Sequence, residues 1–189
     1  MATNPAAKTE IPPMFTPYKL RGVEMINRVV MSPLCMYSAE DGVVGDWHVV
    51  HLGSRAMGGA GLVIAEMSAV HPDGRISIRD AGIWDDKHTE PWKRVVDFVH
   101  ENTDSKIGIQ LGHAGRKADT GLSWQRGTDA QMEYGFDIVA PTAIPVSERA
   151  RTPRVITDEE IVALPGLYKR ATERAEEAGF DLLNFHCAH

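Results

Sequence analysis

The chain has 189 residues, 43% of them hydrophobic and 24% charged, which is typical of a globular protein able to bury a substantial core. Its 26 acidic and 20 basic residues give a formal net charge of -6, which argues against nucleic acid or an anionic membrane as the main partner. The sequence contains no run of the roughly 18 apolar residues that a membrane-spanning helix needs. Its two cysteines are too few for a disulfide framework and favour a cytoplasmic location.

Along the chain, short apolar runs alternate with longer helical patterns. The first residues, 1–11, lack the apolar segment of a secretory signal and are expected to form a flexible leader to one domain over residues 12–189. Four runs are predicted as strands, at residues 27–33, 60–67, 105–113 and 180–189. Three helices are predicted between them, at residues 45–59, 89–102 and 157–179.

The helix ends carry recognisable capping residues. Asp46 and Thr89 are predicted as the N-caps of the first and second helices. Thr157 and Glu160 have the spacing of a capping box at the start of the third helix. Pro165 is expected to kink or break that helix after its second turn, because proline removes a backbone donor and clashes with the preceding turn.

Strands that alternate with helices and are apolar almost throughout predict a parallel sheet covered by helices. An open doubly wound sheet and a (β/α)8 barrel both fit this pattern, and both bind ligands at the C-terminal ends of their strands. Polar residues lie at or just after the C-terminal end of each predicted strand: Ser32, Cys35, Tyr37, Glu66, Gln110, His113, His186 and His189. The long connection over residues 114–156 leaves from the same end, so we expect it to lie over the ligand-binding face.

Several of these side chains allow more than one interpretation. His186 and His189 are core or rim residues of the strand end, two of the ligands of a zinc ion, which lacks convincing further ligands here, or donors of two N–H bonds to one oxygen. Cys35 is either a small buried hydrophobic residue or a thiol beside a redox cofactor. Gln110 is either a satisfied core amide or a partner for a ring edge with complementary donor and acceptor. Tyr37 presents either a substrate-facing hydroxyl or a half-buried aromatic ring.

Four blocks of the sequence together resemble a known family. They are "MFTPYKLRGVEMINRVVMSPLCMYSAEDG", "GGAGLVIAEMSAVHPDGRISIRDAGIW", "KIGIQLGHAGRKA" and "AGFDLLNFHCAH". In this order they resemble the Old Yellow Enzyme family of flavin oxidoreductases, in particular its thermophilic-like branch. They are also similar to the reductase-like domain of salicylyl-CoA and aminobenzoyl-CoA flavoenzymes. The resemblance extends over residues 12–189.

The resemblance implies a TIM (β/α)8 barrel, of which this chain holds about the first four βα units. It implies FMN as cofactor, NADPH or NADH as reductant, and a small-molecule substrate with an activated alkene, with a CoA ester among the options. It also allows a homo-oligomer and implies no metal site. The cofactor-binding residues carried over from the family motifs are Ser32, Pro33, Leu34, Cys35, Met67 and Gln110. The catalytic residues carried over are His186 and His189, which grip the substrate oxygen, Tyr37, which contacts the substrate, and Cys35, which modulates the flavin potential.

In the family, a tyrosine proton donor and the flavin phosphate site follow the position of His189. We therefore expect residues 12–189 to be the N-terminal half of an FMN-binding barrel. The alternative is a non-catalytic half-barrel that acts only by association with a complementary half.

Overall fold

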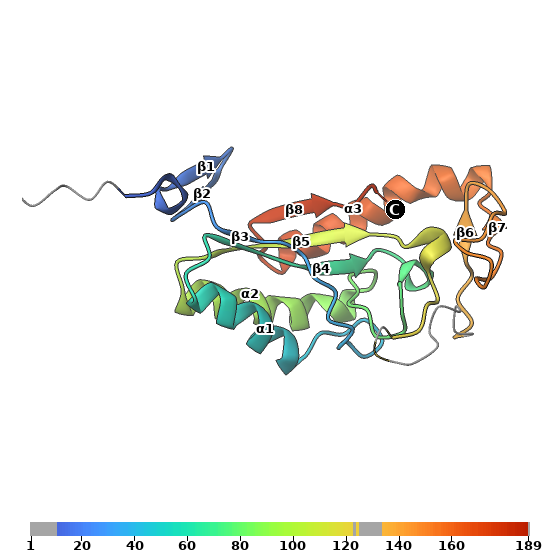
Figure 1. Cartoon of the computed structure of the whole chain (residues 1–189), viewed down its shortest axis with the longest axis horizontal. Helices are drawn as coiled ribbons and strands as arrows, with labels where there is room; N and C mark the ends of the chain where they lie inside the picture. Colours follow the sequence, from blue (N-terminus) through green and yellow to red (C-terminus); the bar gives the residue numbers. More distant parts are fainter. Residues whose placement is uncertain (1–10, 123, 125–133, 189) are drawn as a thin grey trace, which may run out of the picture.

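The computed structural model describes residues 11–122, 124 and 134–188, and a four-stranded parallel sheet forms its centre. In the order in which they pair, its strands are β3 (Val30–Met31), β4 (Leu62–Ala69), β5 (Lys106–Gly112) and β8 (Leu182–Phe185). The helices that connect successive strands are α1 (Asp46–Met57), α2 (Thr89–Asn102) and α3 (Asp158–Glu177). The strands point the same way in Figure 1, so their C-terminal ends meet at one edge of the molecule.

Small elements lie at both ends of this sheet. At the N-terminal end is the antiparallel hairpin of β1 (Tyr18–Leu20) and β2 (Val23–Met25). At the C-terminal end is the parallel pair of β6 (Val139–Ala140) and β7 (Arg154–Val155), to the right in Figure 1. Short 3-10 turns occur at Pro13–Phe15, Pro72–Gly74, Asp86–His88 and Gly115–Lys117.

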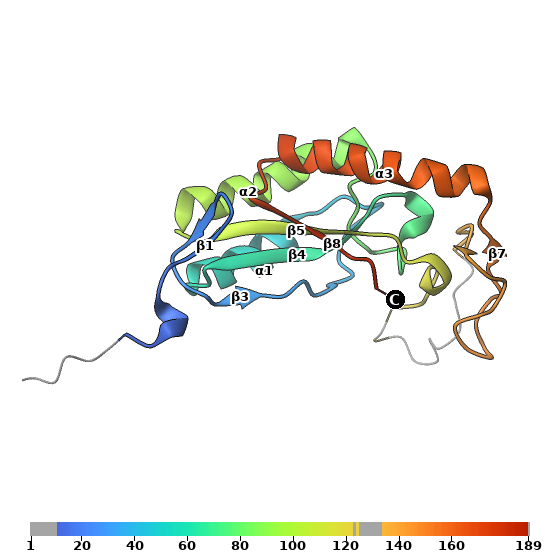
Figure 2. The same cartoon turned by 90° about the horizontal axis from the view of Figure 1, so that it is seen from above.

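The core lies between the sheet and its helices. Helix α2 buries the stripe of residues Trp92, Val95, Val96 and Val99, because their spacing places them on one helical face. This face packs on β5, whose Ile107 and Ile109 are fully buried. Each such side chain contributes about 1.5–3 kcal/mol of hydrophobic stabilisation relative to an exposed one. Figure 2 shows α2 and α3 running along the same side of the strands.

The predicted helices and strands are present, but two predicted N-caps are wrong. The N-cap of α1 is Gly45, and Asp46 is the first helical residue. The cap bond here comes from His48, whose Nδ1 accepts the Gly45 N–H at 3.2 Å. Thr89 is likewise the first residue of α2 rather than its cap, because a 3-10 turn capped by the Asp85 side chain leads directly into the helix.

The third helix confirms one prediction and corrects another. Its capping box forms as expected, with the Thr157 N–H donating to Glu160 Oε2 at 2.8 Å and the Glu160 N–H donating to Thr157 Oγ1 at 3.3 Å. Of the kink or break predicted at Pro165, the break is wrong, because α3 continues through Pro165 to Glu177. Pro165 lies on the exposed side of the helix. A carbonyl that loses its partner there remains open to water, which lowers the cost of the missing bond.

Candidate functional site

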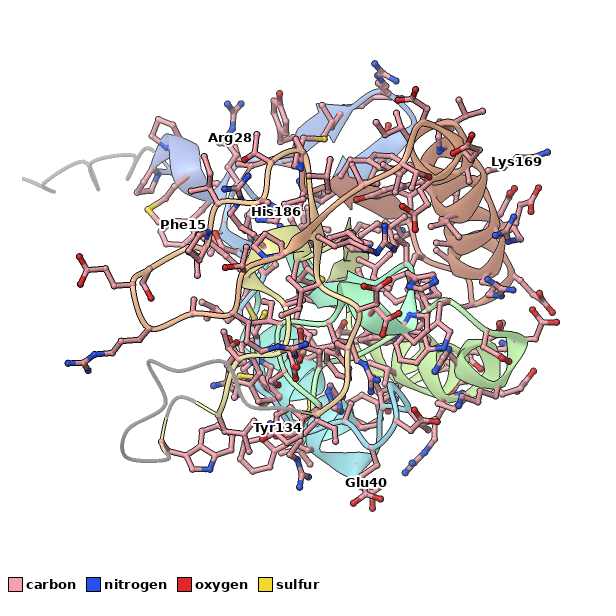
Figure 3. The ribbon with its side chains drawn as sticks, turned by 90° about the vertical axis from the view of Figure 1, so that its right-hand side faces the viewer. Phe15, Arg28, Glu40, Tyr134, Lys169 and His186 are labelled. Carbon is pink, nitrogen blue, oxygen red and sulfur yellow. The ribbon has the colours of Figure 1, made fainter. Side chains whose placement is uncertain are left out.

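The C-terminal ends of the central strands surround a cavity of about 230 Å³. It is lined by Cys35, Met67, Ile76, Gln110, His113, Ala114, Lys117, His186 and Ala188. Figure 3 looks onto this end of the sheet and shows His186 near its middle. Four residues predicted from the sequence, from four separate segments, therefore meet in one place: Cys35, Met67, Gln110 and His186.

A one-residue bulge in β4 sets which side chains reach the cavity. The register between β4 and β5 shifts between Ala65 and Met67, so Ala65 pairs with Ile109 whereas Met67 pairs with Gln110. Glu66 is the extra residue of this bulge. Bulges near active sites re-aim side chains in this way. As a result, Met67 and Gln110 lie side by side at the same face of the sheet.

Gln110 is oriented by the neighbouring strand. It pairs in register with Asn184 of β8 and donates its Nε2–H to Asn184 Oδ1 at 2.7 Å. This bond fixes the orientation of the Gln110 amide group. It does not use the amide carbonyl oxygen or the second N–H. Glycine is required nearby, because a Cβ on Gly112 would lie 2.8 Å from Met67 Cγ. Because Gly112 of β5 has no side chain, the Met67 side chain fits beside it.

Cys35 presents a protonated thiol to the cavity. Burial, followed by the nearby carboxylates of Asp80 and Glu66, raises the pKa of this thiol to about 12, while a bond from the Met67 backbone N–H partly opposes the shift. A thiol with this pKa stays neutral at physiological pH and keeps its S–H donor. Burial also raises the pKa of the Tyr37 hydroxyl to about 12.

His113 is a cavity residue that the sequence analysis did not place among the binding residues. Burial lowers the pKa of its imidazole, which favours the neutral ring. Its Nδ1 accepts the Gly115 N–H at 3.1 Å, so the ring proton belongs on Nε2. The ring stacks on His71 with a centroid distance of 6.2 Å. The sequence signal that points to His113 is its position at the C-terminal end of a predicted strand.

His186 occupies the position expected of it, at the tip of β8. Its backbone N–H donates to the Leu111 carbonyl at 2.9 Å, which extends the pairing of β5 and β8 by one residue and fixes the direction of the side chain. The second predicted histidine, His189, lies outside the described residues, so its role remains a prediction.

The remaining predicted residues lie beside the cavity rather than in its lining. Ser32, Pro33 and Leu34 form the segment that connects β3 to Cys35, and the Leu34 side chain is 58% exposed. The Tyr37 ring packs edge-on against Trp124 at a centroid distance of 6.2 Å. Their contacts with a cofactor or substrate therefore remain predictions.

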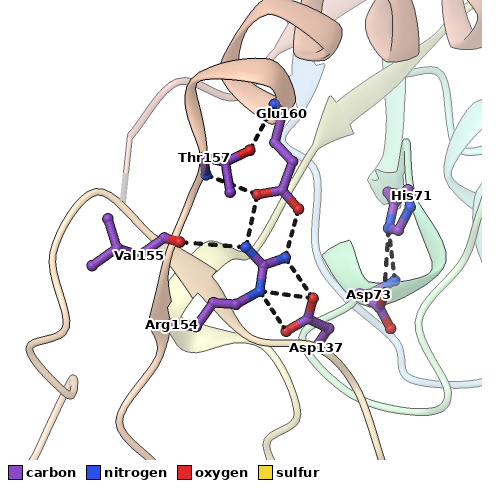
Figure 4. A network of polar contacts seen from close by, with 7 residues as sticks. All are labelled: His71, Asp73, Asp137, Arg154, Val155, Thr157 and Glu160. Atoms are coloured by element: carbon purple, nitrogen blue, oxygen red, sulfur yellow. Dashed lines mark hydrogen bonds and ion pairs between the residues drawn. The ribbon is translucent and has the colours of Figure 1, made fainter.

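The described parts of the long connection after β5, residues 114–122, 124 and 134–156, lie at the C-terminal end of the strands, and ion pairs anchor the last of these parts. Arg154 joins Asp137 to Glu160 of α3, with its Nη2 2.6 Å from Asp137 Oδ2 (Figure 4). These bonds raise the pKa of Arg154 and lower the pKa of Glu160 to about 2. Arg75 lies between the rings of Trp84 and Phe136, at 5.1 and 4.5 Å from their centroids. The connection thereby forms a wall beside the cavity.

The residues of the cavity fit one part of a flavin. A thiol, an amide and an imidazole are neutral hydrogen-bonding groups, which suit the edge and face of an uncharged heterocycle. The cavity is smaller than the roughly 300–1,000 Å³ of a complete small-molecule site, so these residues would hold the ring of FMN rather than the whole cofactor. Within the described residues, no group of three or more potential ligands is placed to bind a metal ion, and no helix is long and apolar enough to cross a membrane.

Comparisons with known proteins match nearly the whole chain. The model of the NADH:flavin oxidoreductase / NADH oxidase family matches residues 13–189. An NADPH dehydrogenase of Geobacillus sp. (strain WCH70) is 45% identical over 178 residues, which cover 93% of this chain and 48% of that protein. The NADPH dehydrogenase of Bacillus subtilis (strain 168) is 43% identical over the same shares. The chain thus spans about half the length of these relatives.

Solved structures of related enzymes share the fold. A morphinone reductase in complex with tetrahydroNAD superimposes with a TM-score of 0.80 and 31% identity, over 94% of this chain and 50% of that one. An Old Yellow Enzyme from Pichia sp. AKU4542 gives a TM-score of 0.78 and 28% identity, over 94% and 46%. These likenesses confirm the predicted architecture, in which the parallel sheet and its helices are part of an α/β barrel.

Proposed function

The chain belongs to the NADH:flavin oxidoreductase / NADH oxidase family, and from that membership we propose that the full-length protein is an FMN-dependent oxidoreductase of the Old Yellow Enzyme type. NADPH or NADH would serve as reductant, and the substrate would carry an activated carbon–carbon double bond. Residues 12–189 would form the N-terminal half of the FMN-binding barrel, behind a leader of residues 1–11. The two free cysteines favour a cytoplasmic enzyme.

One observation carries this proposal most directly. Cys35, Met67, Gln110 and His186 come from four segments that are far apart in the sequence, yet they line one cavity at the strand ends. A purely structural role for each residue gives no reason for a thiol, an amide and an imidazole to converge on an opening. Binding of a flat heterocycle gives such a reason, because its face needs apolar contact and its edges need donors and acceptors.

The proposed roles follow from the chemistry of these groups. Bound FMN would supply hydride transfer from the nicotinamide to the alkene. Gln110 would bind the edge of the ring, and the Cys35 thiol, held neutral, would lie beside it as a weak donor. His186 would donate an N–H to the substrate oxygen, with His189 as its predicted partner. Negative charge that develops on this oxygen is stabilised more in the transition state than in the ground state, which lowers the barrier.

A second, more apolar cavity of about 530 Å³ adjoins the first and supports an enone-like or aromatic acyl substrate. It shares His186 and His113 with the first cavity and is otherwise lined mainly by apolar residues such as Leu164 and Tyr168. A substrate bound through its carbonyl at His186 would place its apolar part there. Parallel assays with a simple enone and with the CoA ester of an aromatic acid would identify the preferred acyl group.

Stopped-flow kinetics of the full-length protein with FMN test the role of His186. We expect His186→Ala to slow alkene reduction by about 10²–10³-fold, as for loss of one oxyanion donor, while flavin reduction by NADPH changes much less. His100→Ala, at the opposite end of the sheet, is the matched control and should leave alkene reduction unchanged. An equal loss in both half-reactions of His186→Ala would contradict the assigned role.

The half-barrel that acts only by association is the second candidate. It is supported by the edge strands of the sheet, since Val30 in β3 is 44% exposed and Phe185 in β8 is 49% exposed. Unpaired strand edges favour association with another sheet. A homo-oligomer of the full-length enzyme is a separate proposal, which light scattering of that protein would test.

A further inference from the structure

Glu66 is a buried carboxylate beside the cavity to which the proposed chemistry gives no role. It is the extra residue of the β4 bulge and is only 4% exposed. A buried carboxylate is costly unless other groups compensate its charge and its lost hydration. The partners of its two oxygens therefore show what holds it in place.

One oxygen binds the loop that carries Cys35. Glu66 Oε1 accepts the backbone N–H of Met36 at 3.1 Å. This loop, residues 32–39, has no regular secondary structure. It also contains a strained position, because Tyr37 has a φ of 50°, in the left-handed region that bulky residues disfavour. A loop with this conformation needs bonds from outside itself, and the Glu66 carboxylate supplies one next to Cys35.

The other oxygen faces His48 in the first turn of α1. His48 is fully buried, and its Nδ1 accepts the Gly45 N–H, so Nε2 is the ring nitrogen that carries a proton. That Nε2 lies 3.4 Å from Glu66 Oε2, a polar contact that does not have the geometry of a hydrogen bond. Nε2 has no hydrogen-bond partner among the described residues, so the Glu66 carboxylate is the acceptor that this contact brings near it. The rings of Trp92 and His48 pack in an edge-to-face arrangement, with their centroids 6.0 Å apart.

We propose that His48 and Glu66 are positioning residues, which link the start of α1 through the β4 bulge to Met36 and thereby hold the Cys35 thiol at the cavity. Neither residue lines the cavity, so neither is assigned a contact with substrate or cofactor. That His48 and Glu66 hold the loop in place does not depend on the proposed function. That the loop thereby fixes the Cys35 thiol beside FMN rests on the proposed function.

Site-resolved alkylation tests the proposal in the full-length protein without FMN. Iodoacetamide labelling of Cys35 is followed by mass spectrometry of its peptide and normalised to the rate in denatured protein. His48→Leu removes the N–H toward Glu66 and leaves every carboxylate near the thiol in place. We expect labelling of Cys35 to accelerate about tenfold, because loss of one buried polar contact favours local opening of the loop. His48→Gln retains an N–H donor at a similar reach and should label nearly as slowly as the wild type.

Val99→Ala is the matched control, because it opens a gap in the fully buried core without touching the loop. Cys35 labelling at the wild-type rate in Val99→Ala, together with fast labelling in His48→Leu, supports the proposal. An unchanged or slower rate in His48→Leu overturns it, as does equal acceleration in Val99→Ala.

If His48→Leu does not fold, hydrogen exchange of the wild-type protein tests the proposal instead. The bond to Glu66 predicts a protected Met36 amide within an irregular loop, whereas exchange at the rate of a free loop amide overturns the proposal. Both measurements are made without FMN, so their failure is distinguishable from failure of the proposed function. In the protein with FMN, His48→Leu should in addition shift the flavin absorbance bands, while His48→Gln should restore them.

Discussion

At the scale of single residues, the site depends on groups kept neutral by burial. Cys35 and Tyr37 both have pKa values raised to about 12, with burial as the leading cause. Cys35 also lies near Asp80, whose own pKa burial raises to about 6. A neutral thiol donates a weak hydrogen bond without adding a charge beside a ring, and this is the behaviour that the proposed function needs.

The pH dependence of Cys35 alkylation tests this neutrality. Because burial disfavours the thiolate, the folded protein without FMN should show a labelling rate that rises about tenfold per pH unit from pH 7 to pH 10 without a plateau. Site-resolved mass spectrometry with iodoacetamide measures the rate. Denatured protein is the control and should approach its plateau near the ordinary thiol pKa of about 8.5. A plateau below pH 10 in the folded protein would show that burial does not govern this thiol.

The sequence predicts individual site residues only in part. The strand-end pattern predicts that Cys35, Gln110 and His186 lie at the ligand-binding face, because the ends of parallel strands meet in space, and the family resemblance implies their roles there. The bond from Met36 to Glu66 was not predicted, because it joins residues 30 positions apart and depends on a bulge that no local pattern reveals. The sequence also does not predict that Leu34 lies outside the cavity lining. In a loop, no periodic pattern shows which side chains point toward a cavity and which point toward solvent.

At the scale of elements, apolar periodicity predicted the helices and strands, whereas their ends depended on neighbours. The strand predicted at residues 27–33 is shortened to Val30–Met31, because only these two residues pair with β4. The next strand extends past its predicted end to Ala69, because β5 still offers Gly112 as a partner. Long-range pairing decides both boundaries.

Gly61, at the entry to β4, allows a close backbone approach whose energetic importance can be measured. A Cβ at this position would lie 2.3 Å from the Asn27 carbonyl oxygen. We expect Gly61→Ala to lower the free energy of unfolding by about 1–3 kcal/mol, because the backbone must shift to relieve the clash. Urea denaturation of the full-length protein measures this.

Gly22 is the matched control for this substitution. A Cβ there would meet nothing within 4 Å, and its φ is not positive. Gly22→Ala should therefore change the free energy of unfolding by less than about 1 kcal/mol, and in the stabilising direction. Equal destabilisation by both substitutions would show that the contact at Asn27 is not the cause.

At the scale of the whole molecule, the order of its elements is that of a partial α/β barrel, and the chain spans about half the length of the relatives it matches. The sheet exposes apolar residues at its edge strands, including Phe185 in β8. The prediction of this architecture succeeded because the alternation of strands and helices is encoded locally. Alternation alone left an open sheet as the alternative, and the family resemblance favoured the barrel.

Residues 1–189 prepared alone should associate rather than remain monomeric, because the exposed edge of β8 offers backbone donors and acceptors as well as an apolar side chain. Size-exclusion chromatography with light scattering measures the mass. Phe185→Lys places a charge on this edge and should shift the population toward the monomer, whereas Lys169→Ala, on the exposed surface of α3, should not. A stable monomer of the unaltered chain at micromolar concentration would contradict this expectation.

The central claim is that the strand ends converge on a flavin, and FMN titration of the full-length protein tests it most directly. Quenching of flavin fluorescence gives the dissociation constant of the wild type, of Gln110→Leu, and of Glu90→Gln as a control in the exposed first turn of α2. We predict saturable binding to the wild type and to Glu90→Gln. Gln110→Leu should bind about tenfold or more weakly, because an edge of the ring loses its hydrogen-bonding partner. The absence of flavin binding by the wild type, or equal affinity in all three proteins, would contradict the claim.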